Sequence, residues 1–142
     1  RDRFKSTRTD MTVDDLYAAF ARALGVDRSH CVNMYGMTEL SSQIYDQNIL
    51  SYYTDGSLNY SKETPSWVRS VFLDPATLAP VPDGEQGVIA HYDLANWNSC
   101  LAILTEDLGV RSSYGYTLNG RAKGAEARGC SITVDEVMAA NA

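Results

Sequence analysis

The run "NMYGMTE" at residues 33–39 places an aromatic ring, a glycine, a hydroxyl and a carboxylate within a few positions of one another. A flat ring such as Tyr35 can stack on a purine, and Gly36 lets a ligand approach the backbone closely. Thr38 can donate a hydrogen bond to a phosphate oxygen, and Glu39 offers the hard oxygen ligand that Mg²⁺ prefers. The same residues also suit a strand end at which the tyrosine packs and the other two cap a helix, and residue types alone favour neither interpretation.

Two other clusters follow along the chain, and each is a weaker signal. In "LTEDLG", Asp107 comes after an apolar run, where a carboxylate can accept two hydrogen bonds from a ribose diol; an acidic residue in a turn is more often solvated or capping. In "NGRAKGAEARGCS", Arg121 can bind phosphate or ribose, although a solvated basic turn with Lys123 and Arg128 is the commoner case. Neither cluster predicts a site by itself.

Taken in order, the three clusters resemble the acyl-adenylate-forming superfamily. "YGMTE" is similar to its "YGxTE" motif, "TED" stands where the superfamily has its ribose-binding "TGD", and "NGRAKG" stands where it has "GRxKD". The intervening "LDPATLAPVPDGEQGVIAHYDLAN" is also similar, so the resemblance spans roughly residues 30–137. Two departures stand out: Glu106 replaces a glycine beside the retained Asp107, and Gly124 replaces the aspartate at which a C-terminal lid rotates.

The same departures are typical of the acyl-protein synthetases of the LuxE type, which the segment "GRAKGAEARGCS" also resembles. In that family the acyl group passes from the adenylate to a cysteine near the C-terminus, and Cys130 occupies the matching place. Arg128 and a nearby helix N-terminus would favour the thiolate that such a nucleophile requires. Without the resemblance, a small buried hydrophobe would be the simpler interpretation of Cys130.

The resemblance implies that ATP and Mg²⁺ are used to activate a carboxylic acid, here a fatty acid, as an acyl adenylate that then acylates the enzyme. The implied catalytic residues are Cys130, Thr38 and Glu39, with Glu39 also the metal ligand; the implied nucleotide-binding residues are Tyr35, Gly36, Thr38, Asp107 and Arg121. Two alternatives stay open. One is a phenylacetate-CoA-ligase-like or amino-acid-adenylating enzyme that passes the acyl group to CoA or a carrier. The other is a non-catalytic nucleotide-binding remnant.

The elements that position these residues predict an α/β (α+β) fold, the C-terminal part of an adenylating domain. Apolar residues at helical spacing predict a helix over residues 12–24, which Thr12 caps and Gly25 ends. The apolar segment "HCVNMYGMTEL" predicts a buried strand that delivers a loop to the site. Residues 45–66 have no sustained period and predict a long loop or hairpin insertion.

The C-terminal half has the pattern of short strands from Trp67 onward, which predicts a small antiparallel sheet or distorted barrel. Thr133 and Glu136 form a capping-box signature, so we expect a helix to close the chain. The whole chain, residues 1–142, is expected to be a single domain. Residues 1–66 would form the end of a nucleotide-binding α/β sheet with a loop, and residues 67–142 a β-rich subdomain with a terminal helix.

Composition limits the class of protein. The chain has 142 residues, of which 44% are hydrophobic, enough for one core, and a net charge of −6 that disfavours nonspecific binding to nucleic acid. No apolar run approaches the ~20 residues of a membrane span, so a cytoplasmic protein is expected. Three scattered cysteines and two histidines argue against a disulfide framework or a zinc site.

The chain is also expected to be part of a longer enzyme. It begins with Arg1, and the Ser/Thr/Gly/Lys-rich loop that cradles triphosphate in the superfamily is not among its 142 residues. A missing N-terminal part of the same protein would supply that loop, so these residues alone should be inactive. The resemblance also implies an acyl reductase as a partner protein.

Overall fold

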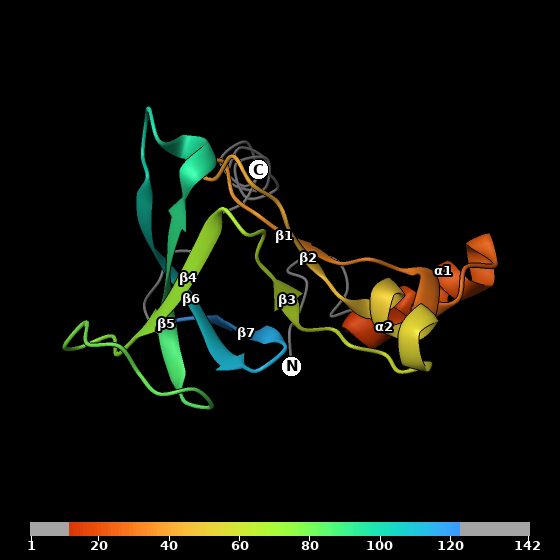
Figure 1. Cartoon of the computed structure of the whole chain (residues 1–142). Coiled ribbons are helices and arrows are strands. Elements are labelled where there is room, and N and C mark those ends of the chain that lie inside the picture. The colour runs from red at the N-terminus through yellow and green to blue at the C-terminus, as the bar shows by residue number, and fades with distance from the viewer. Residues whose placement is uncertain (1–11, 123–142) are drawn as a thin grey trace, which may run out of the picture.

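A computed structural model of the protein describes residues 12–122, and within them the mixed α/β class is confirmed (Figure 1). Two α-helices, two short 3-10 helices and a single antiparallel sheet make up the fold. In chain order the elements are α1 (Val13–Leu24), η1 (Arg28–His30), β1 (Met34–Tyr35), β2 (Ile44–Asp46), α2 (Asn48–Asp55), β3 (Lys62–Glu63), β4 (Val68–Leu73), β5 (Gln86–Asp93), η2 (Leu94–Asn96), β6 (Ala102–Ser112) and β7 (Gly115–Arg121).

Helix α1 begins and ends where the sequence predicts. The side chain of Thr12 accepts a hydrogen bond from the backbone N–H of Asp15 at 3.1 Å, and the Asp15 carboxylate accepts one from the Thr12 N–H at 3.2 Å. This reciprocal capping box satisfies two N–H groups that a helix start otherwise leaves unpaired. Gly25 ends the helix at φ 65°, a left-handed conformation that costs glycine little.

The segment after β2 differs from its prediction, because residues 48–55 form α2 where the sequence predicted a long loop or hairpin. The side chain of Asn48 is fully buried and donates hydrogen bonds to the carbonyl oxygens of Arg28, at 2.8 Å, and Cys31, at 3.1 Å. Both carbonyl groups belong to residues that are distant from Asn48 in the sequence. A helix as short as α2 is therefore stabilised by tertiary contacts, which its own sequence pattern does not reveal.

The sheet has the strand order β1-β2-β3-β7-β6-β5-β4, and every neighbouring pair is antiparallel. It stays open, so of the two predicted forms the antiparallel sheet is confirmed and the barrel is not formed. The strand predicted to be buried before the "YGMTE" loop is β1, which has two residues, one exposed and one half-buried. Strand β6 continues through Ser112, and the chain reverses at residues 113–114.

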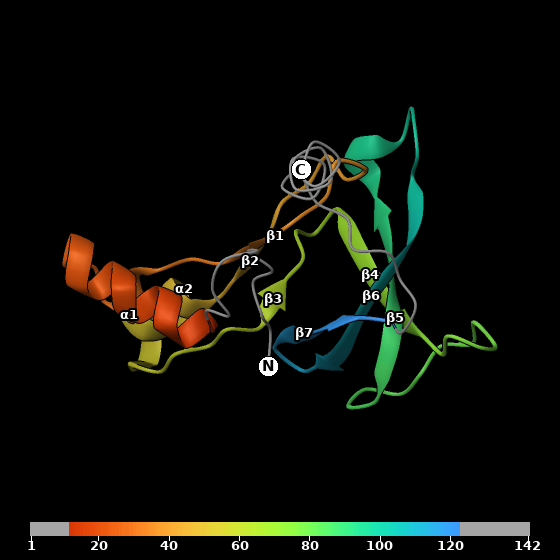
Figure 2. The ribbon, with the colours of Figure 1, turned by 180° about the vertical axis from the view of Figure 1, so that it is seen from behind.

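The two ends of the molecule differ in secondary structure and in burial. Figures 1 and 2 show β4 to β7 at one end, both helices at the other, and β1 to β3 between them. The buried apolar core lies with the strands and the loops beside them; its members are Leu40, Ile44, Val68, Phe72, Ile89 and Tyr116. Helix α1 has no buried residue. Neither described helix combines the length and apolar character needed to cross a bilayer.

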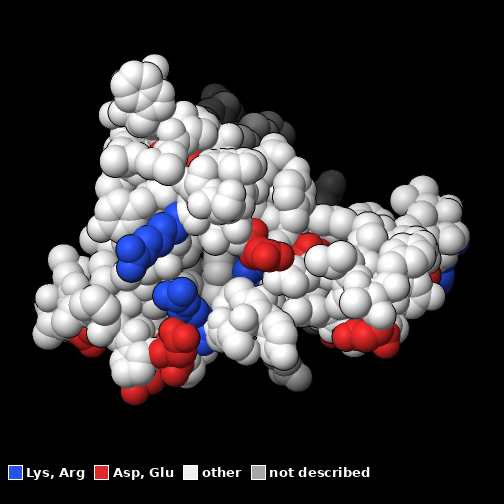
Figure 3. Space-filling view, viewed as in Figure 1, with Lys and Arg blue, Asp and Glu red and all other residues white. Residues whose placement is uncertain are grey.

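Charged side chains are sparse on the face of the sheet shown in Figure 3, and both signs occur there. Arg111 and Asp83 form one exposed pair, with 3.7 Å between Nε and Oδ1. Apolar side chains are also exposed on this sheet, including Tyr92 and Leu104, with exposed fractions of 45% and 53%, and Trp67 in the turn before β4 is 51% exposed. The sheet therefore buries a core and also leaves large apolar side chains exposed to solvent.

Candidate functional site

Asp107 lies within β6, where the sequence suggested a turn. Its pairing partner on β7 is Arg121, and the register between the two strands shifts between Asp107 and Gly109. Such irregularities bend a strand locally and re-aim its side chains, and they are common beside binding sites. Beside this bulge, the half-buried Asp107 carboxylate faces residues of β1 and β7.

Three residues predicted from separate motifs meet at this carboxylate. The hydroxyl of Tyr35 donates a hydrogen bond of 2.7 Å to Oδ2 of Asp107, across 72 positions of sequence. Nε of Arg121 lies 3.6 Å from the other carboxylate oxygen, and its Nη2 lies 2.6 Å from Oε2 of Glu106. The structure therefore brings Tyr35, Asp107 and Arg121 together, and it adds Glu106, the residue that departs from the superfamily motif.

Tyr35 is held in place by contacts of its hydroxyl and of its ring. Burial raises the pKa of its hydroxyl well above the ordinary value, and the hydrogen bond to Asp107 raises it further. The hydroxyl therefore stays protonated, as the donor in that bond. On the inner side its ring packs against the imidazole of His91, with 5.6 Å between the ring centroids and 42° between the planes.

His91 is a residue that the sequence analysis considered only as a zinc ligand. It is fully buried on β5, and its Nδ1 shares a 2.8 Å hydrogen bond with the hydroxyl of Ser70 on β4. Burial lowers the pKa of the imidazole to about 4, against the opposing effect of the carboxylates of Asp107 and Asp93. A neutral ring thus lies under Tyr35. Its position between apolar residues in "VIAHYDL" was the available signal.

The loop from Gly36 to Ser42 presents the other predicted residues. Thr38 and Glu39 are exposed, and the threonine hydroxyl donates a 3.0 Å hydrogen bond to Oε2 of the glutamate. A Cβ added at Gly36 would meet no atom within 4 Å, so the space beside this backbone is open. Within residues 12–122, no hydrogen bond or ion pair joins Thr38 or Glu39 to Asp107.

The loop is held by residues that the sequence analysis missed. Its backbone and serine side chains bind Asp93 and Asn96, which lie at the end of β5 and in the turn after it. Both residues stand in "HYDLAN", a segment that we quoted only as part of the resemblance. No residue-type signal marks a buried aspartate as an anchor, because acidic residues before a turn are usually solvated.

The remaining predicted residues lie outside the described part of the chain. These are Cys130 and its neighbours Lys123, Gly124 and Arg128, together with the capping residues Thr133 and Glu136 of the expected terminal helix.

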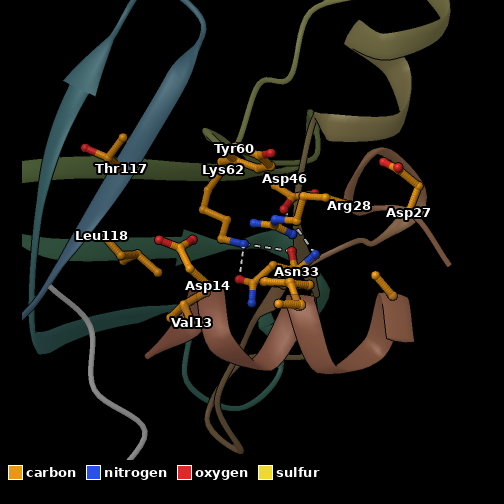
Figure 4. A pocket seen from close by; sticks show the side chains of 13 residues that line it. Val13, Asp14, Asp27, Arg28, Asn33, Asp46, Tyr60, Lys62, Thr117 and Leu118 are labelled. Atoms are coloured by element: carbon orange, nitrogen blue, oxygen red, sulfur yellow. Dashed lines mark hydrogen bonds between the residues drawn. The ribbon is translucent and has the colours of Figure 1, made fainter. Parts of the chain in front are cut away.

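A second polar region is a cavity of about 680 Å³ between α1, η1 and β7 (Figure 4). The guanidinium of Arg28 lies between two rings, 3.3 Å from the centroid of Tyr17 and 4.2 Å from that of Tyr60. The amino group of Lys62 donates to the backbone oxygen of Asn33 at 2.7 Å and to its side-chain oxygen, and burial lowers the pKa of that amine. Of the predicted site residues that the structure describes, none lines this cavity.

Comparison with known proteins agrees with the family that the motifs resemble. Two relatives share the description "Long-chain-fatty-acid–luciferin-component ligase". The relative from Aliivibrio fischeri is 41% identical over 49 residues, which are 34% of this chain and 13% of that protein. The relative from Vibrio harveyi is 26% identical over 83 residues, which are 54% of this chain and 22% of that protein. The matches thus span a minor part of either relative's length.

A family profile matches nearly the whole chain, over residues 4–139, and its description is "Acyl-protein synthetase, LuxE". The profile match includes every residue of the Tyr35, Asp107 and Arg121 cluster and the whole of the "YGMTE" loop. This chain belongs to the LuxE family of acyl-protein synthetases.

Proposed function

We propose that the chain is the C-terminal portion of an ATP-dependent enzyme of the acyl-adenylate-forming superfamily, and that Tyr35, Asp107 and Arg121 bind the nucleotide. The observation that supports this most directly is the convergence of three separately predicted motifs on one carboxylate. Each oxygen of Asp107 faces one protein group, and a carboxylate has about four acceptor positions. Acceptor positions therefore remain for the two hydroxyls of a ribose.

The first half-reaction joins the acid to AMP. A carboxylate oxygen of the substrate attacks the α-phosphorus of ATP, the bond from that phosphorus to the bridging oxygen breaks, and pyrophosphate leaves with the electron pair. Such phosphoryl chemistry depends chiefly on positioning and charge stabilisation. Arg121 would stabilise charge on the nucleotide, and Thr38 would donate a hydrogen bond to a phosphate oxygen.

The second half-reaction transfers the acyl group to the enzyme. The thiolate of Cys130 attacks the acyl carbon, the bond from that carbon to the AMP oxygen breaks, and AMP leaves, so that a thioester remains. The thiol proton passes to solvent or to a neighbouring base before the attack. The proposal for Cys130 is supported by the family resemblance, because this residue lies outside the described part of the chain.

Magnesium is proposed as the cofactor that accompanies ATP. Within residues 12–122, no three His, Cys, Asp or Glu side chains gather as a dedicated metal cage would need. Mg²⁺ that is bound mainly by substrate phosphates and water needs only one or two protein carboxylates, and the exposed Glu39 fits that requirement. When bound, the ion would neutralise charge on the phosphates.

The adenine base is assigned to Tyr35 and Gly36. One side of the tyrosine ring packs against His91, and the hydroxyl is held by Asp107, so the ring is already immobilised before a ligand arrives. A ring held in this way loses little conformational freedom when a purine stacks on it. The open space at Gly36 lets the ligand approach the backbone.

The substrate and partners follow from the relatives and the family. The names of the two relatives specify a long-chain fatty acid, and we propose the same class of acid for this protein. A missing N-terminal part of the same protein would supply the triphosphate loop, an acyl reductase would receive the acyl group, and the complete enzyme would work in the cytoplasm.

A trapping experiment with the complete protein tests the function. With ATP and labelled long-chain fatty acid, the wild type should acquire a hydroxylamine-labile label, and Cys130→Ser should not. Cys100→Ser is the matched control, because Cys100 is an exposed cysteine of the described sheet half, and it should label like the wild type. Label that persists in Cys130→Ser, or acyl transfer only to CoA, would contradict acylation of this cysteine.

A further inference from the structure

The "YGMTE" loop does not reach its position by packing alone. After Glu39 the chain runs alongside the turn that follows β5, so that the loop between β1 and β2 lies beside η2 (Figure 1). Polar side chains make this contact. A loop held by hydrogen bonds in a partly buried place keeps a defined geometry, because breaking any of them leaves a polar group without a partner.

Asp93 is the first anchor of the loop. Its side chain is fully buried, and its Oδ2 accepts a 2.9 Å hydrogen bond from the backbone N–H of Ser42. Its Oδ1 accepts 2.9 Å hydrogen bonds from the hydroxyl of Ser42 and from the N–H of Ala95. The hydroxyl of Ser42 in turn accepts a 2.9 Å hydrogen bond from the indole of Trp67. Three bonds to one carboxylate satisfy a charge that burial would otherwise make costly.

Asn96 is the second anchor, and it lies closer to the motif. Its side-chain NH₂ donates a 2.5 Å hydrogen bond to the backbone oxygen of Glu39, and its side-chain oxygen accepts a hydrogen bond from the hydroxyl of Ser41. Asn96 is itself buried, with 8% of its surface exposed. The amide thus joins two successive parts of the loop to one rigid turn.

We propose that Asp93 and Asn96 are positioning residues, which hold the Thr38 and Glu39 side chains where phosphate and Mg²⁺ are bound. This inference rests on the proposed function, because it assumes that those two side chains act on ATP. Because Asn96 binds the backbone of Glu39, the anchor does not use the Glu39 carboxylate, which is exposed and accepts a hydrogen bond from Thr38. Nucleotide binding by Asp107 would remain when the anchors are removed, since Asp107 belongs to a different strand, β6.

The test uses the complete protein and carboxylate-dependent pyrophosphate exchange. Asn96→Ala should lower kcat by about 10-fold or more, because small displacements of catalytic groups have effects of this size. The KM for ATP should change by less than about 3-fold, since groups that act mainly in the transition state affect kcat. The Mg²⁺ concentration for half-maximal rate should rise. Asn98→Ala is the matched control: Asn98 is exposed and has no side-chain hydrogen bond among the described residues.

A milder variant guards against misfolding. Ser41→Ala removes one hydrogen bond from an exposed residue and should shift the Mg²⁺ dependence in the same direction as Asn96→Ala, by less. The inference is overturned if, in both variants, kcat per folded molecule and the Mg²⁺ dependence are the same as in Asn98→Ala and the wild type. Absence of pyrophosphate exchange in the wild type would contradict the proposed function, and with it this inference. Exchange that requires Glu39 but not Asn96 would contradict the inference alone.

Discussion

The sheet end and the helix end of this molecule bury their apolar side chains to different extents. The strands enclose Phe72 and Ile89, with exposed fractions of 4% and 0%. Helix α1 has a regular apolar stripe but no buried residue, and Leu24 at its end is 68% exposed. An amphipathic helix gains most of its stability by packing that stripe against a neighbour. The comparison shows that the sheet end contains its own core, whereas the apolar stripe of α1 stays partly exposed among the described residues.

The largest expected effects come from two phenylalanines. In residues 1–142 expressed alone, Phe72→Ala should lower the free energy of unfolding by about 3–5 kcal/mol, because it empties part of the core. Phe20→Ala on α1, where the ring is 38% exposed, should cost less than about 1 kcal/mol.

The same pair should behave differently in the complete enzyme. In the complete enzyme, Phe20→Ala should lower the free energy of unfolding by clearly more than about 1 kcal/mol, because we propose that the missing part of the protein covers α1. Chemical denaturation of both forms measures the difference. Equal and small costs in the two forms would refute the idea that α1 gains a partner.

The next effect concerns the pH dependence of the sheet end. His91 has a pKa of about 4 in the folded protein and an ordinary value of 6.5, so the unfolded chain binds more protons between these values. The contribution of neutral His91 to the free energy of unfolding should be fully present above about pH 6.5. This free energy should fall by about 3 kcal/mol at most as the pH decreases to about 4.

His91→Gln should flatten this part of the profile, as measured by urea unfolding at several pH values. The wild-type profile, measured under the same conditions, is the reference. An unchanged slope in the His91 variant would mean that other groups cause the acid sensitivity.

A smaller effect is expected at two glycines. A Cβ at Gly109 on β6 would lie 2.8 Å from the backbone oxygen of Thr117 and 3.0 Å from the ring of Phe72. Gly109→Ala should therefore destabilise the protein by about 1–3 kcal/mol, as overpacking does. Gly36→Ala has open space and should cost about 0.5 kcal/mol or less. Thermal unfolding distinguishes them, and equal melting temperatures would argue against the tight packing of β6 and β7.

Local signals predicted much of this fold, because they act over a few residues. The capping box at Thr12 and the glycine after Leu24 set the ends of α1, and both lie inside one short window of sequence. The strands from Trp67 onward were visible as apolar runs. Helix α2 was not predictable in this way, since Asn48 is held by carbonyl groups of residues 28 and 31.

In the candidate site, too, some residues could be predicted from local sequence and others could not. Motif order pointed to Tyr35, Asp107 and Arg121, and the sheet register then places them together. Asp93 and His91 act through burial and through partners on other strands, which spacing along one strand does not reveal. Candidate site residues could thus be proposed where a ligand would require particular residue types, whereas the residues that support them from other strands could not.

Substitution of Asp107 tests the central claim most directly. Asp107→Asn is nearly isosteric and keeps an acceptor for Tyr35, but it removes the charge that faces Arg121 and one of the acceptors that we propose for ribose. In the complete protein, pyrophosphate exchange at subsaturating ATP should fall by about 10- to 100-fold, the loss expected for a charge-assisted hydrogen bond. Asp83→Asn, at an exposed turn of the same sheet, should match the wild type. Unchanged exchange in Asp107→Asn would contradict the assignment of this cluster to the nucleotide.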